Sequence, residues 1–106
     1  SLYYRMRERI VKFMKGPRGK KYTAIVEEKG TRKRRRIHFG ASDYQQYKDR
    51  TPLGLYSHKD HGTRKRMQNY FSRHSGTRSR TKAIKLERKK SKGYYNAKIL
   101  SHEYLW

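Results

Sequence analysis

The chain has 106 residues, which bounds it to one domain with a thin core, because 32% of the residues are apolar while 36% are charged. Thirty lysines and arginines stand against eight aspartates and glutamates, giving a formal net charge of +22. A surplus of this size predicts a phosphate-rich or otherwise acidic partner, since like charges repel in the compact state. The chain has no cysteine, which excludes disulfides and thiolate zinc sites.

The sequence shows no apolar run of membrane-spanning length and no secretory leader. We therefore expect a protein that is neither integral to a bilayer nor secreted by that route. Binding to an anionic membrane surface stays open, because basic segments are attracted to anionic lipids.

The N-terminal segment is expected to be a helix or an arm. Leu2, Met6, Ile10 and Phe13 or Met14 follow one another at spacings of four, four and three, which favours one face of a helix. A strand is the alternative reading, because Met6 and Ile10 share a parity with Tyr4. The Gly-Pro-Arg-Gly sequence at 16–19 ends this element in either case.

A β-hairpin is the next predicted element. Residues 21–28 alternate β-branched and aromatic side chains with polar ones, residues 29–31 form a turn, and residues 34–39 form the returning strand. Arg34 and Arg36 then share one face, which is cationic. The alternative interpretation of these arginines is a solvated edge that is kept charged to prevent aggregation.

The central stretch 37–74 is aromatic and carries four of the five histidines, and its first part, 37–63, has no net charge. Each flank carries +11. Ser42 has the capping spacing of a short helix that ends before Thr51-Pro52. A second helix is predicted to begin near Asp60 or Thr63 and to end at His74, before Ser75-Gly76.

The C-terminal third is predicted to contain a basic arm and a docking segment. The arm has few apolar residues and is expected to be extended and ordered only by its partner. In the docking segment, aromatic and aliphatic side chains fall at helical spacing and are expected to anchor the chain end: Tyr95, Ile99, Tyr104 and Trp106. The predicted fold is thus a small single α+β domain with a β-hairpin, two or three short helices and extended basic arms. Its parts are an N-terminal helix or arm (1–20), a core of hairpin plus helices (21–74), a basic extended arm (75–93) and a C-terminal docking segment (94–106).

Two groups were considered for chemistry. His58, Asp60 and His61 could meet on one helical turn, but their spacing matches no common zinc pattern, so no metal is predicted. Asp43 and Asp49 could join Asp60 as nuclease carboxylates, yet each stands where a turn or cap favours aspartate. Neither a phosphate-binding glycine loop nor a catalytic serine motif is present, and no cofactor and no enzymatic activity are expected.

The basic side chains are the strongest functional signal. They are spread over hairpin, helix and arm, and could neutralise phosphates along a path without reading bases. Nothing resembles a recognition helix or an RNA-binding sheet motif. The candidate polyanion-binding residues are Arg32, Lys33, Arg34, Arg35, Arg36, Arg64, Lys65, Arg66, Arg73, Arg78, Arg80, Arg88, Lys89 and Lys90.

The chain from about Tyr22 onward also resembles a family of small basic proteins of large nucleocytoplasmic DNA viruses. The residues that carry the resemblance are Ile37-His-Phe-Gly40, Tyr44, Tyr47, Asp49, Thr51, His58-Lys-Asp60, Arg64-Lys65-Arg66, Tyr70, Arg73-His74 and Tyr104-Leu-Trp106. The resemblance does not include the N-terminal segment, and the stretch 77–92 is longer and more basic than the family pattern. It implies no catalytic residue. It implies a virion or viral-factory context and a structural role as a minor capsid or core component.

Two functional readings follow from these observations. The first is a non-enzymatic virion structural protein that bridges neighbouring virion proteins and acidic surfaces, either nucleic acid or an inner membrane, through its basic arms. The second is a ribosomal-type or other nucleic-acid-packing protein without sequence specificity, which has the same composition.

Overall fold

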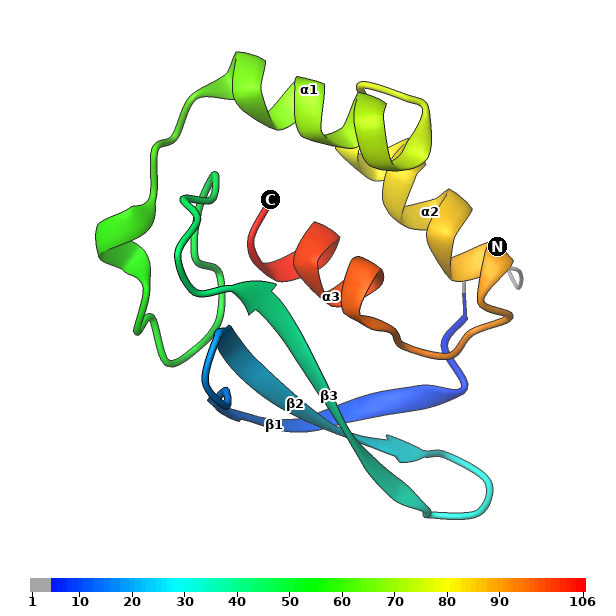
Figure 1. Cartoon of the computed structure of the whole chain (residues 1–106). Coiled ribbons are helices and arrows are strands. Elements are labelled where there is room, and N and C mark those ends of the chain that lie inside the picture. Colours follow the sequence, from blue (N-terminus) through cyan, green and yellow to red (C-terminus); the bar gives the residue numbers. More distant parts are fainter. Residues whose placement is uncertain (1–4) are drawn as a thin grey trace.

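The computed structural model of the chain describes residues 5–106, in which an antiparallel sheet is followed by helices that pack on it as an α+β domain (Figure 1). The predicted fold class is therefore confirmed. The elements in chain order are β1 (Glu8–Lys15), β2 (Lys20–Glu28), β3 (Arg34–Ala41), a single 3-10 turn η2 (Ser57–Lys59), α1 (Arg64–Ser75), α2 (Arg80–Lys90) and α3 (Ala97–Tyr104).

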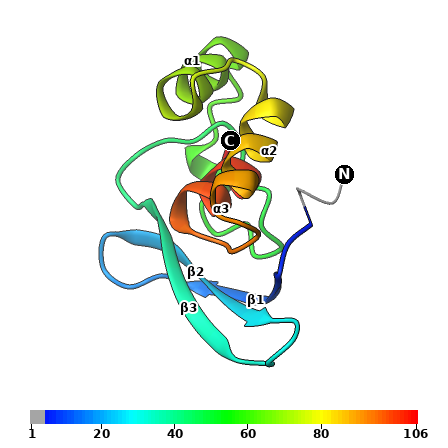
Figure 2. The ribbon, with the colours of Figure 1, turned by 90° about the vertical axis from the view of Figure 1, so that its right-hand side faces the viewer.

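The three strands form one antiparallel sheet in the order β1-β2-β3. Helix α3 lies against one face of this sheet, and the α1–α2 pair lies on the far side of α3 (Figures 1 and 2). The other face of the sheet is left to solvent. This arrangement is typical of an antiparallel sheet with one packed and one exposed face.

The N-terminal element is a strand, and the predicted helix is wrong. A register shift between Ile10 and Lys12 leaves Val11 as an extra residue in β1. Ile10 and Phe13 are three positions apart and would point to opposite faces of a regular strand. The bulge lets both face the core, opposite Val26 and Ala24. That spacing of three imitates a helix, which explains the error. Leu2 and Tyr4, on which the two readings also drew, lie outside the described residues.

The hairpin prediction is confirmed by β2 and β3. Arg34 and Arg36 are exposed on the outer face, while Ile37 and Phe39 are buried against the helices. The sheet register places Arg36 beside Ile25 and Arg34 beside Glu27, so on the outer face of these two strands one arginine lies beside a carboxylate and the other does not.

The short helix predicted from Ser42 is wrong, because the main chain there is used for long-range pairing. The main-chain N–H of Gln46 donates to Lys59 O, and its main-chain carbonyl accepts from His61 N. Two residues later, Lys48 N donates to Leu105 O at 3.1 Å, which ties this loop to the C-terminus. Backbone groups committed to other segments cannot form the i→i−4 bonds of a helix.

Helix α1 begins and ends as predicted, with Thr63 as N-cap and Gly76 as a left-handed C-cap. The segment 75–93, predicted as an extended arm, instead contains helix α2. Ser79 caps this helix by accepting a bond from Lys82 N, and Ala83 and Glu87 are buried on its inner face. Among residues 5–106, no helix is both long and apolar enough to cross a bilayer.

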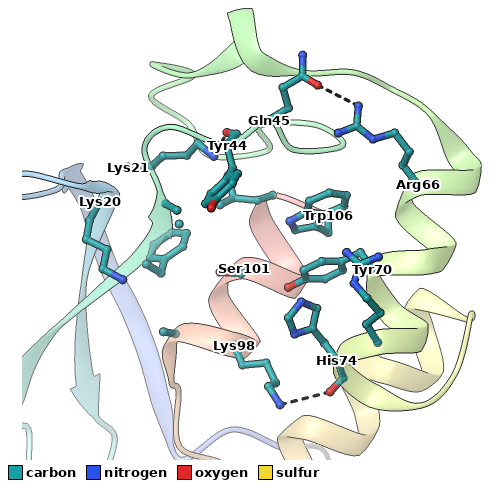
Figure 3. A pocket seen from close by; sticks show the side chains of 16 residues that line it. Lys20, Lys21, Tyr44, Gln45, Arg66, Tyr70, His74, Lys98, Ser101 and Trp106 are labelled. Carbon is teal, nitrogen blue, oxygen red and sulfur yellow. Dashed lines mark hydrogen bonds between the residues drawn. The ribbon is translucent and has the colours of Figure 1, made fainter.

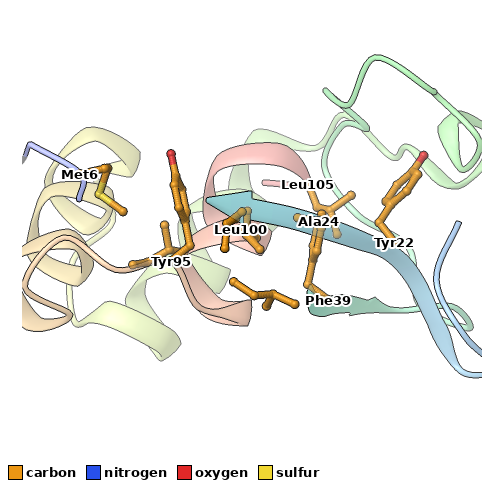
Figure 4. Packing of buried hydrophobic residues seen from close by; sticks show 10 residues of the cluster. Met6, Tyr22, Ala24, Phe39, Tyr95, Leu100 and Leu105 are labelled. Carbon is orange, nitrogen blue, oxygen red and sulfur yellow. The ribbon is translucent and has the colours of Figure 1, made fainter. Parts of the chain in front are cut away.

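The core lies between the sheet and α3 (Figure 4). Ile99 and Leu100 of α3 are fully buried against β2 and β3, and Leu105 closes the end of the sheet beside Gly40. Gly40 has a φ of +77°, and a Cβ there would lie 2.8 Å from Leu105 Cδ1, so only glycine fits. The C-terminal segment therefore completes the core of the domain.

Candidate functional site

The acidic side chains form hydrogen bonds within the molecule. In the described part of the chain seven of the eight carboxylates accept hydrogen bonds: Glu8, Glu27, Glu28, Asp49, Asp60, Glu87 and Glu103. Thirty basic side chains share these eight acids. The surplus positive charge therefore faces solvent or a partner.

On the hairpin, the candidate polyanion-binding residues differ in whether they pair with a carboxylate of the domain. Glu27 stands between Arg9 and Arg34 on the neighbouring strands and accepts from both, with Arg34 Nε at 3.0 Å. These two bonds lower the pKa of Glu27. Arg32 lies 4.0 Å from the same carboxylate, at the edge of ion-pairing distance.

Arg35 is a structural residue. Its guanidinium donates two bonds to Glu8, at 2.8 and 2.9 Å, and a third to the carbonyl of Tyr95 at 2.6 Å. Burial alone would raise the pKa of Glu8, but Arg35 and the Tyr95 N–H outweigh it and the pKa is lowered. All five hairpin candidates are exposed, and among the described residues Lys33 and Arg36 are the two of them that lie beyond ion-pairing distance of any carboxylate.

On the helices, the candidates also differ in their surroundings. Arg80 donates to Glu103 O at 2.9 Å, and Arg88 forms a two-pronged pair with the Glu103 carboxylate. Lys90 lies 3.9 Å from Glu87. The candidates that are exposed on the helices and their connection are Arg64, Lys65, Arg66, Arg73, Arg78, Lys89 and Lys90.

The four docking residues pack within the chain itself. Tyr95 and Ile99 are buried in the core, and the Tyr104 ring meets Phe13 edge-on at 4.7 Å. Trp106 stacks parallel on Tyr70, with 4.2 Å between ring centroids. The end of the chain is therefore anchored on helix α1.

A cavity of about 660 Å³ opens between the end of the sheet, the loop after β3, and helices α1 and α3 (Figure 3). Its volume falls within the range of small-molecule sites, about 300–1,000 Å³. The lining residues are Lys20, Lys21, Phe39, Gly40, Ala41, Tyr44, Gln45, Arg66, Tyr70, Arg73, His74, Ala97, Lys98, Ser101, Leu105 and Trp106. Five of these are lysines or arginines and none is acidic, so the cavity concentrates positive charge.

Helical spacing brings two of the candidate polyanion-binding residues into this cavity. Arg66, Tyr70 and Arg73 lie at i, i+4 and i+7 on α1, which places them on one face. Arg64 and Lys65, their neighbours in sequence, do not line the cavity. The two sets of cations on α1 thus point to different surroundings.

Three of the five cavity cations are each held by one hydrogen bond to a neutral oxygen. Lys21 Nζ donates to Tyr44 O at 2.6 Å, Lys98 Nζ to His74 O at 3.3 Å, and Arg66 to Gln45 Oε1 at 2.9 Å. Burial lowers the pKa of Lys21 to about 8, with Lys59 adding to the shift. Lysine and arginine carry further N–H donors beyond these bonds.

Behind the cavity, a buried polar chain joins the three helices. Ser75 Oγ donates a hydrogen bond to Glu87 Oε2 at 2.7 Å and lies 2.8 Å from His102 Nε2. His102 Nδ1 lies 2.8 Å from the Tyr70 hydroxyl. Since an ionised glutamate only accepts, Ser75 accepts from His102 and His102 accepts from Tyr70. In a hydrolytic triad the histidine would instead take the serine proton. This Ser-His-Glu group is a structural network.

Two of the three candidate nuclease carboxylates, Asp49 and Asp60, hold loops together. Asp49 accepts from the Tyr22 hydroxyl at 2.5 Å and from Thr51, and Asp60 accepts from Gln46 and from Asp49 N. Within residues 5–106, no three histidine or carboxylate side chains gather in a way that could hold a metal ion.

Comparison of the chain with protein-family models, with curated proteins and with solved structures gave no match. The resemblance to small basic viral proteins therefore stays a prediction.

Several cavity residues escaped prediction from the sequence. The α1 set could have been found, because its helical spacing is visible in the sequence. Lys21 and Lys98 could not, because each is one more lysine in a basic segment and only the fold brings them together. Tyr44 stands out only through its position, since it is 72% exposed and lies at the cavity.

Proposed function

We propose that this chain is a non-enzymatic structural protein that binds phosphate-rich surfaces within a large assembly. In line with the viral resemblance, the proposed assembly is the virion of a large DNA virus, where the protein is a minor capsid or core component that bridges neighbouring proteins and nucleic acid or an inner membrane. The contact is made by fixed faces of a folded domain and not by an extended arm.

The observation that carries this proposal is that the acidic side chains bond to groups within the domain. Glu8, Glu27 and Glu87 are almost completely buried and already bonded within the domain, so they pair only with the cations beside them and leave the rest of the surface charge without an acidic partner. Lys33 and Arg36 remain exposed on the sheet side, and Arg64 on the helix side. Cations on both sides of one small domain suit a protein that lies between two acidic neighbours.

The test is the salt dependence of binding to a DNA duplex. Neutralisation of phosphates releases counterions, so the logarithm of the affinity should fall linearly with the logarithm of the salt concentration. The slope should be about −0.9 for each phosphate contact. Replacing Lys33 and Arg36 by glutamine should reduce this slope by about two contacts. A slope near zero for the unaltered protein would refute the proposal.

Fractionation distinguishes the two kinds of assembly. A fixed ratio of this protein to the major shell protein in purified particles supports the virion role. Co-sedimentation with ribosomal subunits instead supports the ribosomal-type packing role.

A further inference from the structure

The cavity between the sheet, α1 and α3 combines two kinds of surface. Its floor is apolar and aromatic, with Phe39, Leu105 and the stacked Tyr70–Trp106 pair. Its positive groups come from three separate elements and are not balanced by any acidic lining residue. A ligand that fits both surfaces has a flat apolar part and a negative part.

Tyr44 provides a second flat surface at the cavity. It is 72% exposed, the highest exposure among the large apolar or aromatic side chains of the described residues. Figure 3 shows the Tyr44 ring on the loop side of the cavity and the Tyr70–Trp106 pair on the helix side. An aromatic ring left exposed beside a cationic hollow is the arrangement on which nucleic-acid bases stack.

The lysine at the back of the cavity indicates where the negative part would lie. Lys21 is 2% exposed, and among residues 5–106 no carboxylate lies within ion-pairing distance of it. Its direct contacts are one hydrogen bond to Tyr44 O and the face of the Tyr56 ring at 6.0 Å. Asp49, Asp60 and Lys59 act on its charge from beyond ion-pairing distance. A buried ammonium without an acidic partner is costly, and a bound anion would offset that cost.

We propose that this cavity binds a single nucleotide, with the base between Tyr44 and the Trp106 side of the floor and the phosphate at Arg66, Arg73 and the cavity lysines. The inference rests on the proposed affinity for phosphate-rich partners and assigns one specific site to it. An acidic peptide would match the charges but offers no flat ring for Tyr44. A duplex cannot enter, because its bases are stacked and paired, so it must use the outer faces.

Two kinds of ligand present the same base and phosphate to the cavity: a free nucleoside phosphate and an unpaired nucleotide of a single strand. Trp106 is the only tryptophan of the chain and lines the cavity, so its fluorescence reports occupancy directly. The probes are adenosine monophosphate, a short oligothymidylate and a duplex of matched length. Quenching by the mononucleotide indicates a free-nucleotide site, and quenching by the oligonucleotide alone indicates a single-strand site. The duplex should bind without a matching change in Trp106 fluorescence.

Two variant pairs make the test specific to the cavity. Tyr44→Ala should weaken the binding that quenches Trp106 by roughly fivefold to a hundredfold, while Tyr94→Ala, a partly exposed tyrosine outside the cavity, should leave it unchanged. Arg66→Gln combined with Arg73→Gln should weaken it by at least about tenfold. The control is Arg64→Gln with Lys65→Gln, which removes the same charge from the same helix outside the cavity.

The outcomes separate this inference from the proposed function. If single strands and nucleotides leave Trp106 unchanged, or if the two charge-matched double variants lose affinity equally, the cavity is not the site. Duplex binding with a steep salt slope would then still support the proposed function. Quenching that persists while duplex binding is flat in salt would refute the proposed function and retain the nucleotide site.

Discussion

Lys21 is a single residue whose position lowers the stability of the fold. Its side chain lies under the loop at Tyr44, and burial lowers its pKa to about 8 from 10.5. Because the pKa in the folded state lies below that in the unfolded state, the charged lysine destabilises the fold at neutral pH. This cost disappears only as the pH rises from about 8 to 10.5.

Lys21→Met should therefore raise the free energy of unfolding at pH 7, by on the order of 1–3 kcal/mol, because a methionine of similar shape needs no solvation. Urea unfolding of the variant measures this change. Lys20→Met, next to it in β2 but exposed, should shift the free energy by less than about 0.5 kcal/mol. A Lys21→Met protein less stable than the unaltered chain would show that the ammonium is well compensated.

His102 sets a pH dependence of the same origin in a lower pH range. It is fully buried, and burial lowers its pKa from 6.5 to about 4, although Glu87 works against the shift. Below pH 6.5 the unfolded chain takes up a proton at this position while the folded chain does not. The contribution of His102 to the free energy of unfolding should be fully present above pH 6.5. As the pH falls from 6.5 to 4, the free energy of unfolding should decrease by on the order of 3 kcal/mol.

Chemical denaturation at a series of pH values measures this slope, and His102→Gln should reduce it whatever its effect on absolute stability. The control His58→Gln alters an exposed imidazole and should keep the slope. His74 also has a lowered pKa from burial and nearby cations, so a smaller slope should remain in His102→Gln. A slope that is identical in all three proteins would exclude His102 as its source.

At the scale of the elements, the sequence predicts what is local and misses what is paired over distance. The hairpin and α1 follow from alternation, turn residues and caps that lie within each element. Helix α2 was missed because its stability depends on bonds to other elements. Glu87 bonds Ser75 on α1, and Arg88 bonds Glu103 on α3. Composition alone cannot show such partners, and the segment therefore resembled a disordered arm.

The same distinction applies to the candidate site. The charges on α1 could be read from the sequence, whereas the cavity forms only because the C-terminus returns to the loop after β3. Lys48 N and Arg50 N donate to Leu105 O and Tyr104 O, at 3.1 and 2.8 Å. These contacts join residues more than fifty positions apart, which no local pattern encodes.

Arg35 and Arg36 allow a matched test at this scale, since they are neighbours in β3 with opposite surroundings. Arg35→Lys should lower the free energy of unfolding by about 1–3 kcal/mol, because a lysine cannot bond both Glu8 oxygens and Tyr95 O together. Arg36→Lys, on the exposed face, should change it by less than about 0.5 kcal/mol. Thermal or urea unfolding compares them. Equal losses in both would mean that the Glu8 pair does not join β1, β3 and the start of α3.

For the whole molecule, the decisive quantity is the distance over which its charges act. The domain measures 39 × 30 × 19 Å. At an ionic strength of about 0.01 M the Debye length is about 30 Å, so charges on opposite sides repel each other through the entire thickness. At about 0.15 M it falls to about 8 Å, and only neighbouring charges interact.

Salt should accordingly stabilise this protein. The net charge of +22 makes long-range repulsion the dominant surface term, whereas the favourable pairs of Glu8 and Glu27 are short, partly buried and little screened. The melting temperature should rise as sodium chloride increases from about 0.01 to 0.15 M, as followed by circular dichroism. At equal ionic strength, sulfate should raise it further if anions bind at defined cationic positions. A melting temperature that falls with added salt would mean that the ion pairs outweigh the repulsion, and that the domain needs no acidic neighbour to be stable.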